Sequence, residues 1–290
     1  MILRSSAPAQ AAITALALAT LPLGYAVLAA TKALVDMIGG ATAATAGNLA
    51  AGVALGLGAL ALHGGLKYAL ALLRVRTAER MRRRLRLMHL RRVDPAARQG
   101  LGPALSQEVE IVGGLAGELV ATPLVQLGTI AAALVFLASE HPALALASAL
   151  AALGNIVALR PLQRRAAALA RERVALVRGL NADLIGAAPV RRIVADCTAL
   201  ERVRLRHARV KFLTKLTANL MIGTTPLALI GLGGWLALAG HVSVGGVVAA
   251  VIASREIGPS VRALVAFEQT RLDAGARYVA MRERWSARLA

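Results

Sequence analysis

Six long apolar tracts constrain the fold of this chain more than any other feature of its sequence. An α-helix rises 1.5 Å per residue, so about 20 apolar residues cross the ~30 Å hydrocarbon core of a bilayer. Many residues in the tracts are Ala or Gly, which suit close helix packing in lipid. The tracts cover about 11–36, 48–73, 113–138, 143–160, 217–239 and 244–265. They predict an all-α membrane protein with six transmembrane helices in contact with the lipid bilayer.

The chain is 57% hydrophobic but carries a net charge of +19, because its charges are segregated. Ten Arg fall in 74–112, twelve Arg and two Lys in 160–215, and six Arg in 262–290. The connections MIGGATAATAG, SEHP and GHVS contain no Lys or Arg. Positively charged loops are retained on the cytoplasmic side, so both termini and both long basic segments are expected in the cytoplasm. We expect a multi-pass protein of the inner (plasma) membrane of a bacterium.

Two other interpretations of these features fit less well. The arginines also suit a soluble protein that binds nucleic acid, but the apolar tracts between them would not stay in water, so no nucleic acid partner is expected. The first tract resembles a cleaved signal peptide, but its apolar run lasts past residue 30, and the charge pattern works with a retained span. Cys197 lies in a segment expected in the cytoplasm, so no disulfide is implied.

The two basic segments, about 74–112 and 160–215, are expected to form long cytoplasmic helical arms. The first is rich in Arg, Leu and Met and has no Gly or Pro before Pro95. The second is expected to break at Gly186 and Pro189 and to be otherwise helical. Roughly 20 residues per limb would reach about 30 Å from the membrane. Arms of this length are expected to touch a partner in the cytoplasm.

The second arm contains the stretch GAAPVRRIVADCTALERV. Its pattern resembles that of the transmembrane domain of a type I (six-helix) ABC exporter. The family pattern has a Gly, an apolar-basic pair four residues on, and a charged segment that ends in an Arg and an apolar residue. These positions are here Gly186, Val190, Arg191, Arg202 and Val203.

The outer turn before the sixth tract is also similar to that family. In GLGGWLALAGHVSVGGVVAAV, the small residue, the hydroxyl residue and the Gly of the family pattern are Gly240, Ser243 and Gly245. Pro259 stands where the family often has a proline, and Glu108 matches an acidic residue that restarts the third span. In topology the resemblance covers essentially the whole chain.

The resemblance implies a partner at the arm tips. Each tip would carry a short coupling helix, at about 97–107 and 189–199, lying across an ATPase domain. Dimerisation of two such domains by ATP would switch the cavity by alternating access. A second transmembrane domain, in a homo- or heterodimer, is also implied, because one six-helix domain provides half of the cavity. The candidate coupling residues are Gly100, Glu108, Gly186, Val190, Arg191, Arg192 and Asp196.

The chain itself contains no ATPase motif. A Walker A loop needs Gly-x4-Gly-Lys-Ser/Thr, and none of Lys32, Lys67, Lys211 and Lys215 follows a glycine. We therefore expect no cofactor in this chain. ATP and Mg²⁺ would bind to a nucleotide-binding domain that is either fused after residue 290 or a separate chain. The five histidines are scattered, and no catalytic or metal-ligand constellation is recognisable.

Polar residues inside the apolar tracts mark a candidate translocation path, because such residues are costly in a membrane. Arg255 and Glu256 lie about 15 Å into the sixth span, where a charge must line a water-filled cavity or be paired. Gln126 and Asn219 are expected in the same polar interior. An arginine at this depth favours an anionic or amphiphilic cargo.

Two further pairs of polar residues are spaced one helical turn apart. Lys32 and Asp36, near the outer end of the first span, are expected to pair with each other. His63 and Lys67 share a face of the second span, and Lys67 is close enough to the inner end to extend its ammonium group to the interface.

The expected function is the transmembrane permease part of an ATP-driven exporter of an unidentified substrate. The alternative is a membrane scaffold or regulatory subunit that keeps this architecture without ATP-coupled transport. An ATP-independent carrier or channel would not need the arms, and the inverted repeats of many such folds are not recognisable here.

Overall fold

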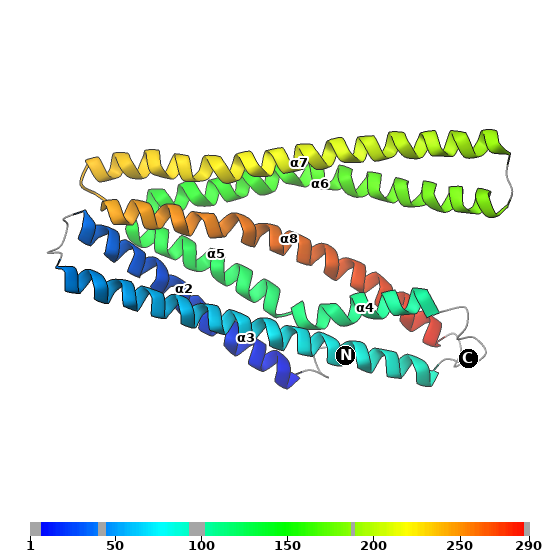
Figure 1. The fold of residues 1–290 in the computed structure, drawn as a ribbon, viewed down its shortest axis with the longest axis horizontal. Coiled ribbons are helices and arrows are strands. Elements are labelled where there is room, and N and C mark those ends of the chain that lie inside the picture. Colours follow the sequence, from blue (N-terminus) through cyan, green and yellow to red (C-terminus); the bar gives the residue numbers. More distant parts are fainter. Residues whose placement is uncertain (1–6, 40–44, 93–101, 187–188, 287–290) are drawn as a thin grey trace. The chain divides into compact units, whose positions relative to one another are not determined.

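The computed structural model describes residues 7–39, 45–92, 102–186 and 189–286, and every regular element in them is an α-helix. Figure 1 shows these helices in chain order. They are α2 (Ala7–Ile38), α3 (Ala46–Arg92), α4 (Gly102–Glu118), α5 (Ala121–Glu140), α6 (Pro142–Ile185), α7 (Val190–Leu238) and α8 (Val244–Ser286). All except α4 contain a stretch long and apolar enough to cross a bilayer, which makes six candidate spans. The prediction of an all-α fold with six helices able to span a membrane is confirmed for the described residues.

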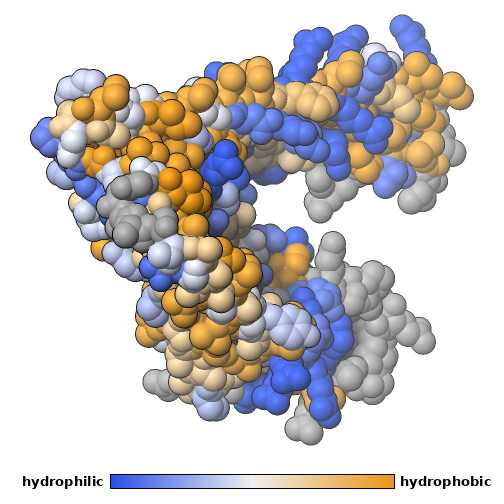
Figure 2. Space-filling view, turned by 60° about the vertical axis from the view of Figure 1, so that its left-hand side comes forward, coloured by the Kyte–Doolittle hydropathy of each residue, from blue (hydrophilic) through white to orange (hydrophobic). Residues whose placement is uncertain are grey.

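The helices group into two compact units. The five-helix unit comprises the described residues of 1–145 and 230–290 and thus contains α2 to α5 and α8. The two-helix unit takes 146–229, which is most of α6 and α7. Figure 2 shows hydrophobic side chains over long stretches of helix surface, with hydrophilic side chains gathered in separate zones. An apolar surface of this extent is expected where helices face lipid.

Three buried clusters hold the five-helix unit together. The first joins α2, α3 and α5 through Ile13, Ala17, Leu70 and Ala121. The second joins α3 to α4 through Met81, Leu85, Val109, Val112 and Ala116. The third joins α4 to α8 through Leu115, Phe267 and Ala274. Helix α4 therefore packs on both α3 and α8, and these three segments form the first arm.

The structure divides the expected third span, 113–138, between two helices. Helix α4 ends at Glu118 and α5 begins at Ala121, so the candidate span is Ala121–Glu140. Pro123 explains the break, because it has no N–H to donate to the carbonyl of Leu119 and its ring clashes with that carbonyl. Gly117 in turn lets α4 pack closely on α3, since a Cβ there would clash with the backbone oxygen of Arg74. Hydropathy alone cannot distinguish glycines that pack on an arm helix from glycines in a lipid-facing helix.

The two-helix unit forms the second arm. Figure 1 shows α6 and α7 as two long antiparallel helices. Ion pairs join them between Arg192 and Asp183 at 2.9 Å and between Arg206 and Glu172 at 3.1 Å. The expected arm is therefore present as a helical pair.

Neither expected coupling helix is a separate element. Residues 190–199 are the first turns of α7, because no Gly or Pro follows Pro189 to interrupt the helix there. Residues 102–107 are the first turns of α4, and 97–101 lie outside the described residues.

Candidate functional site

A cavity of about 230 Å³ opens among α2, α3, α5 and α8, within the segments expected to span the membrane. Most of its lining is apolar. The polar residues that line it are Thr20, Tyr25, His63, Lys67, Thr129 and Glu256. All four helices belong to the five-helix unit, so the cavity is formed within one compact body.

Helix periodicity explains why these side chains meet. His63 and Lys67 are four residues apart on α3 and share one face. On α2, Gly24 faces His63, and a Cβ there would lie 3.6 Å from Cε1 of the imidazole. The imidazole therefore lies beside α2 at ordinary van der Waals distance. Glu256 enters from α8, where the helix continues through Pro259.

The charges of the cavity are not neutralised by the protein. Neither Lys67 nor Glu256 takes part in an ion pair among the described residues. His63 lies within electrostatic range of both, and its buried Nδ1 atom has no hydrogen-bond partner within the described protein. Ionisable groups at membrane depth are costly, and they mark functional sites when they face a cavity. This cavity is therefore the best candidate for a binding site.

The structure separates the residues expected on the translocation path. Glu256 lines the cavity, whereas Arg255 lines another groove, of about 440 Å³, between α7 and α8, where the other lining residues are apolar or Gly. Consecutive helical residues point in directions about 100° apart, so Arg255 and Glu256 cannot share one face. Gln126 is half-buried on α5 and is not among the lining residues of the cavity. Asn219 is exposed on α7 in the two-helix unit.

A larger cleft, of about 500 Å³, lies in the first arm between α3, α4 and α8. Its charged side chains already pair with one another: Arg74 with Glu118 at 3.4 Å, and Arg82 with Glu110 at 3.0 Å. The guanidinium of Arg74 also donates to the Thr122 hydroxyl at 3.0 Å. We assign these contacts to the packing of the arm, and we prefer the smaller intramembrane cavity as a site because its charges have no such partners.

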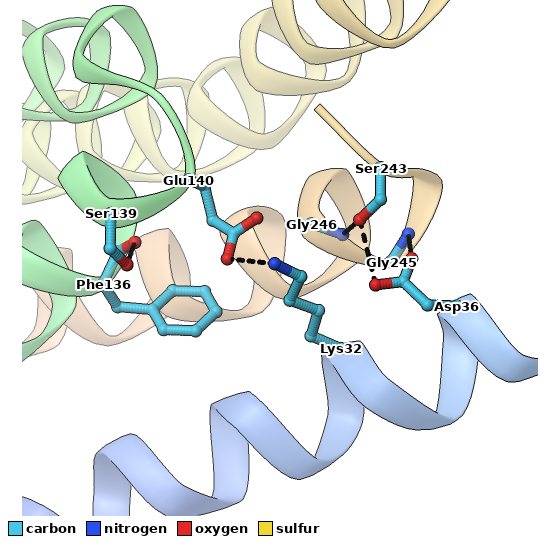
Figure 3. Close-up of polar contacts among 8 residues, drawn as sticks. All are labelled: Lys32, Asp36, Phe136, Ser139, Glu140, Ser243, Gly245 and Gly246. Carbon is cyan, nitrogen blue, oxygen red and sulfur yellow. Dashed lines mark hydrogen bonds and ion pairs between the residues drawn. The ribbon is translucent and has the colours of Figure 1, made fainter. Parts of the chain in front are cut away.

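A polar cluster joins the outer ends of α2, α5 and α8 (Figure 3). The Lys32 ammonium forms an ion pair with Glu140 at 2.8 Å. Asp36 accepts hydrogen bonds from the Ser243 hydroxyl at 3.0 Å and from the backbone N–H of Gly245 at 2.9 Å. The carboxylate thus lies at the N-terminus of α8, where free N–H groups favour a negative charge. The expected pairing of Lys32 with Asp36 is wrong, because each residue has a better partner on another helix.

Close packing fixes this outer cluster. A Cβ on Gly245 would lie 2.5 Å from the backbone oxygen of Lys32, so only glycine allows α8 to start this close to α2. The Ser243 hydroxyl also accepts a hydrogen bond from the Gly246 N–H at 3.0 Å and caps α8.

The sequence analysis did not include Glu140 among the candidate residues, although an acid at the end of an apolar tract was a visible signal.

The candidate coupling residues lie on different parts of the arms. Gly186 lies at the end of α6, and the half-buried Asp196 lies on α7. Arg192 is held by Asp183 within the second arm, whereas Val190 and Arg191 are exposed at the start of α7.

The remaining two candidates belong to the first arm. Glu108 is half-buried on α4, where it has an interaction partner. Gly100 lies outside the described residues. Of the candidate coupling residues, Val190 and Arg191 are thus the ones most available to a docking partner.

Comparison with known proteins identifies no family for this chain. A scan against protein-family models finds no match, and a search of curated proteins finds no significant match.

Proposed function

We propose that this chain is the transmembrane permease part of an ATP-driven exporter of the ABC type. The length of its helices is the observation that carries the proposal. Helices α3, α6 and α7 have 47, 44 and 49 residues. At 1.5 Å per residue each is about 65–75 Å long, roughly twice the ~30 Å core that it must cross. The remaining length forms the two basic arms.

The arms supply a lever for energy coupling. Their arginines favour the cytoplasmic side, where ATP is available, and we propose that both termini lie there in a bacterial inner membrane. ATP and Mg²⁺ would bind to a nucleotide-binding domain outside the residues of this chain. A second transmembrane domain, identical or related, would complete the path. Dimerisation of the ATPase domains would then move the arms and switch access to the intramembrane cavity.

The test is ATP-dependent transport by the chain purified under mild conditions with its associated ATPase and reconstituted in liposomes. We expect ATP hydrolysis to co-purify and to fall when Arg191 and Asp196 are replaced together by Glu and Lys. Arg204→Glu, an exposed position on α7 about 20 Å further along the helix, is the matched control and should leave hydrolysis unchanged.

The alternative, a scaffold or regulatory subunit, predicts a different outcome of the same experiment. An ATPase would co-purify and respond to the arm substitutions, but ATP would drive no transport. If no ATPase associates with the chain, or if transport proceeds without ATP, the proposal of an ATP-driven exporter is contradicted.

A further inference from the structure

The intramembrane cavity has the size of a small solute. Its volume of about 230 Å³ corresponds to roughly eight waters at ~30 Å³ each. Pockets for drug-sized ligands are larger, at about 300–1,000 Å³. A molecule of amino-acid size fits in this space.

The charges of the cavity select among solutes of that size. Lys67 and Glu256 give the lining one charge of each sign, and neither is paired in the described part of the chain. Both side chains are exposed in the open cavity, so a ligand with a single charge would pair with one of them and gain nothing from the other. A ligand with an ammonium and a carboxylate pairs with both through charge-assisted hydrogen bonds.

The rest of the lining suits an apolar body. Leu28, Leu60 and Ile252 present aliphatic side chains to the cavity, and Gly24 leaves space beside them. The cavity therefore combines two opposite charges and an aliphatic wall.

We propose that this cavity binds a small amphoteric solute, with one ammonium group, one carboxylate group and an apolar body. Glu256 accepts hydrogen bonds from the ammonium group, and Lys67 donates to the carboxylate. The apolar body lies against the aliphatic side chains of α2, α3 and α8. The identification of this solute as the transported cargo rests on the proposed function. The binding of the solute in this cavity does not depend on that function.

Binding is measured on the purified full chain in lipid nanodiscs without nucleotide, with radiolabelled leucine, methionine and phenylalanine as probes. For the probe that binds most tightly, the analogue without the ammonium group and the analogue without the carboxylate then compete for the site. We expect binding of at least one probe and competition at least about tenfold weaker by each analogue, since each lacks one charged partner. If no probe binds, or if an analogue binds as tightly as its parent, the proposal is overturned.

Two substitutions test the residues. Lys67→Met and Glu256→Gln should each weaken binding of the parent probe at least about tenfold. Lys67→Met should also abolish the preference for the parent over the analogue without a carboxylate, because Lys67 no longer distinguishes them. Lys215→Met, at an exposed position on α7, and Glu268→Gln, at a carboxylate paired with Arg271 at 2.7 Å, are controls that should bind as the unaltered chain does.

Unaltered affinity in both cavity variants overturns the proposal. The ligand series on the unaltered chain decides the matter even if a variant does not fold. Because nucleotide is absent, binding without ATP-driven transport would support this inference and contradict only the proposed function. ATP-driven transport without binding of any amphoteric probe would support the proposed function and contradict this inference.

Discussion

The two arms of this protein are both rich in Arg and Leu, but they are packed to different extents. In the first arm, apolar side chains such as Leu85 and Val112 are each 1% exposed. In the second arm, Val190 is 75% exposed and Leu205 is 53% exposed. The first arm has a third helical segment, from α8, that covers its apolar face, and the second is a pair of helices. Leu200 and Val203 of the second arm are nevertheless 6% and 2% exposed, so a pair of helices buries part of its apolar surface and a third helical segment buries more.

This contrast bears on the proposed function. Exposed apolar residues on an arm in water mark a surface that another protein covers. In the proposed exporter, we expect the second transmembrane domain to cover the second arm. The first arm, already packed, would instead transmit movement as a rigid body.

The largest expected effect comes from the buried leucine of the first arm. Leu85→Ala removes a side chain that is 1% exposed and should lower the free energy of unfolding by about 2–5 kcal/mol. Leu205→Ala, at a 53% exposed position in the second arm, should cost the monomer less than about 1 kcal/mol. Thermal melting in detergent measures both. Equal losses would mean that the two arms are packed alike.

Glycine substitutions give the next largest effect. A Cβ on Gly117 would lie 2.3 Å from the Arg74 backbone oxygen, whereas nothing lies within 4 Å of one on Gly179 in the second arm. Gly117→Ala should therefore destabilise the chain by about 1–3 kcal/mol. Gly179→Ala should leave stability unchanged or raise it by up to about 1 kcal/mol, because Ala favours a helix. A melting temperature for Gly117→Ala at or above that of the unaltered chain would contradict the close approach of α3 and α4.

Removal of an ion pair should lower the free energy of unfolding less than the glycine substitution does. Arg82→Met removes the contact with Glu110 at 3.0 Å on a partly exposed surface, so the loss should be below about 1 kcal/mol and smaller in high salt. Arg204 in the second arm takes part in no ion pair among the described residues, so Arg204→Met is the matched control and should show no loss. The measurement is melting at low and high ionic strength, and a loss independent of salt would argue against an electrostatic contribution.

The smallest effect on monomer stability is expected at the second arm's exposed apolar surface. Val194→Asp, at a 57% exposed position, should change the free energy of unfolding by no more than about 0.5 kcal/mol. The same change should reduce the dimer fraction measured by light scattering in nanodiscs, because it places a charge on the surface that we expect a second domain to cover. An unchanged dimer fraction would indicate that the second arm is not an interface between transmembrane domains.

The sequence predicted the helical class and the six spans because the apolar tracts and the arginine-rich segments have long-range regularity. It did not predict where the third span begins, because the glycines at 113, 114 and 117 lie within an apolar tract but pack on α3. It also paired Lys32 with Asp36 from their spacing, whereas both residues bind partners on other helices.

The composition of the cavity could likewise be predicted only in part from the sequence. From the sequence, Glu256 was recognisable as an acid within an apolar tract, and His63 and Lys67 as residues that share one face of a helix. Their common cavity was not predictable, because it depends on the rotation of α3 and α8 about their own axes. That rotation is set by packing against α2 and α5, which no local pattern specifies.

The central claim is that the basic arms project into the cytoplasm from a six-span bundle, and the chain's single cysteine tests it directly. Cys197 is exposed on α7 in the second arm, and His241 is exposed at the outer turn beyond the same span. A membrane-impermeant maleimide should label Cys197 in inside-out vesicles and not in right-side-out vesicles. In the Cys197→Ser background, His241→Cys should show the opposite pattern. Labelling of both positions from the same side would contradict the account.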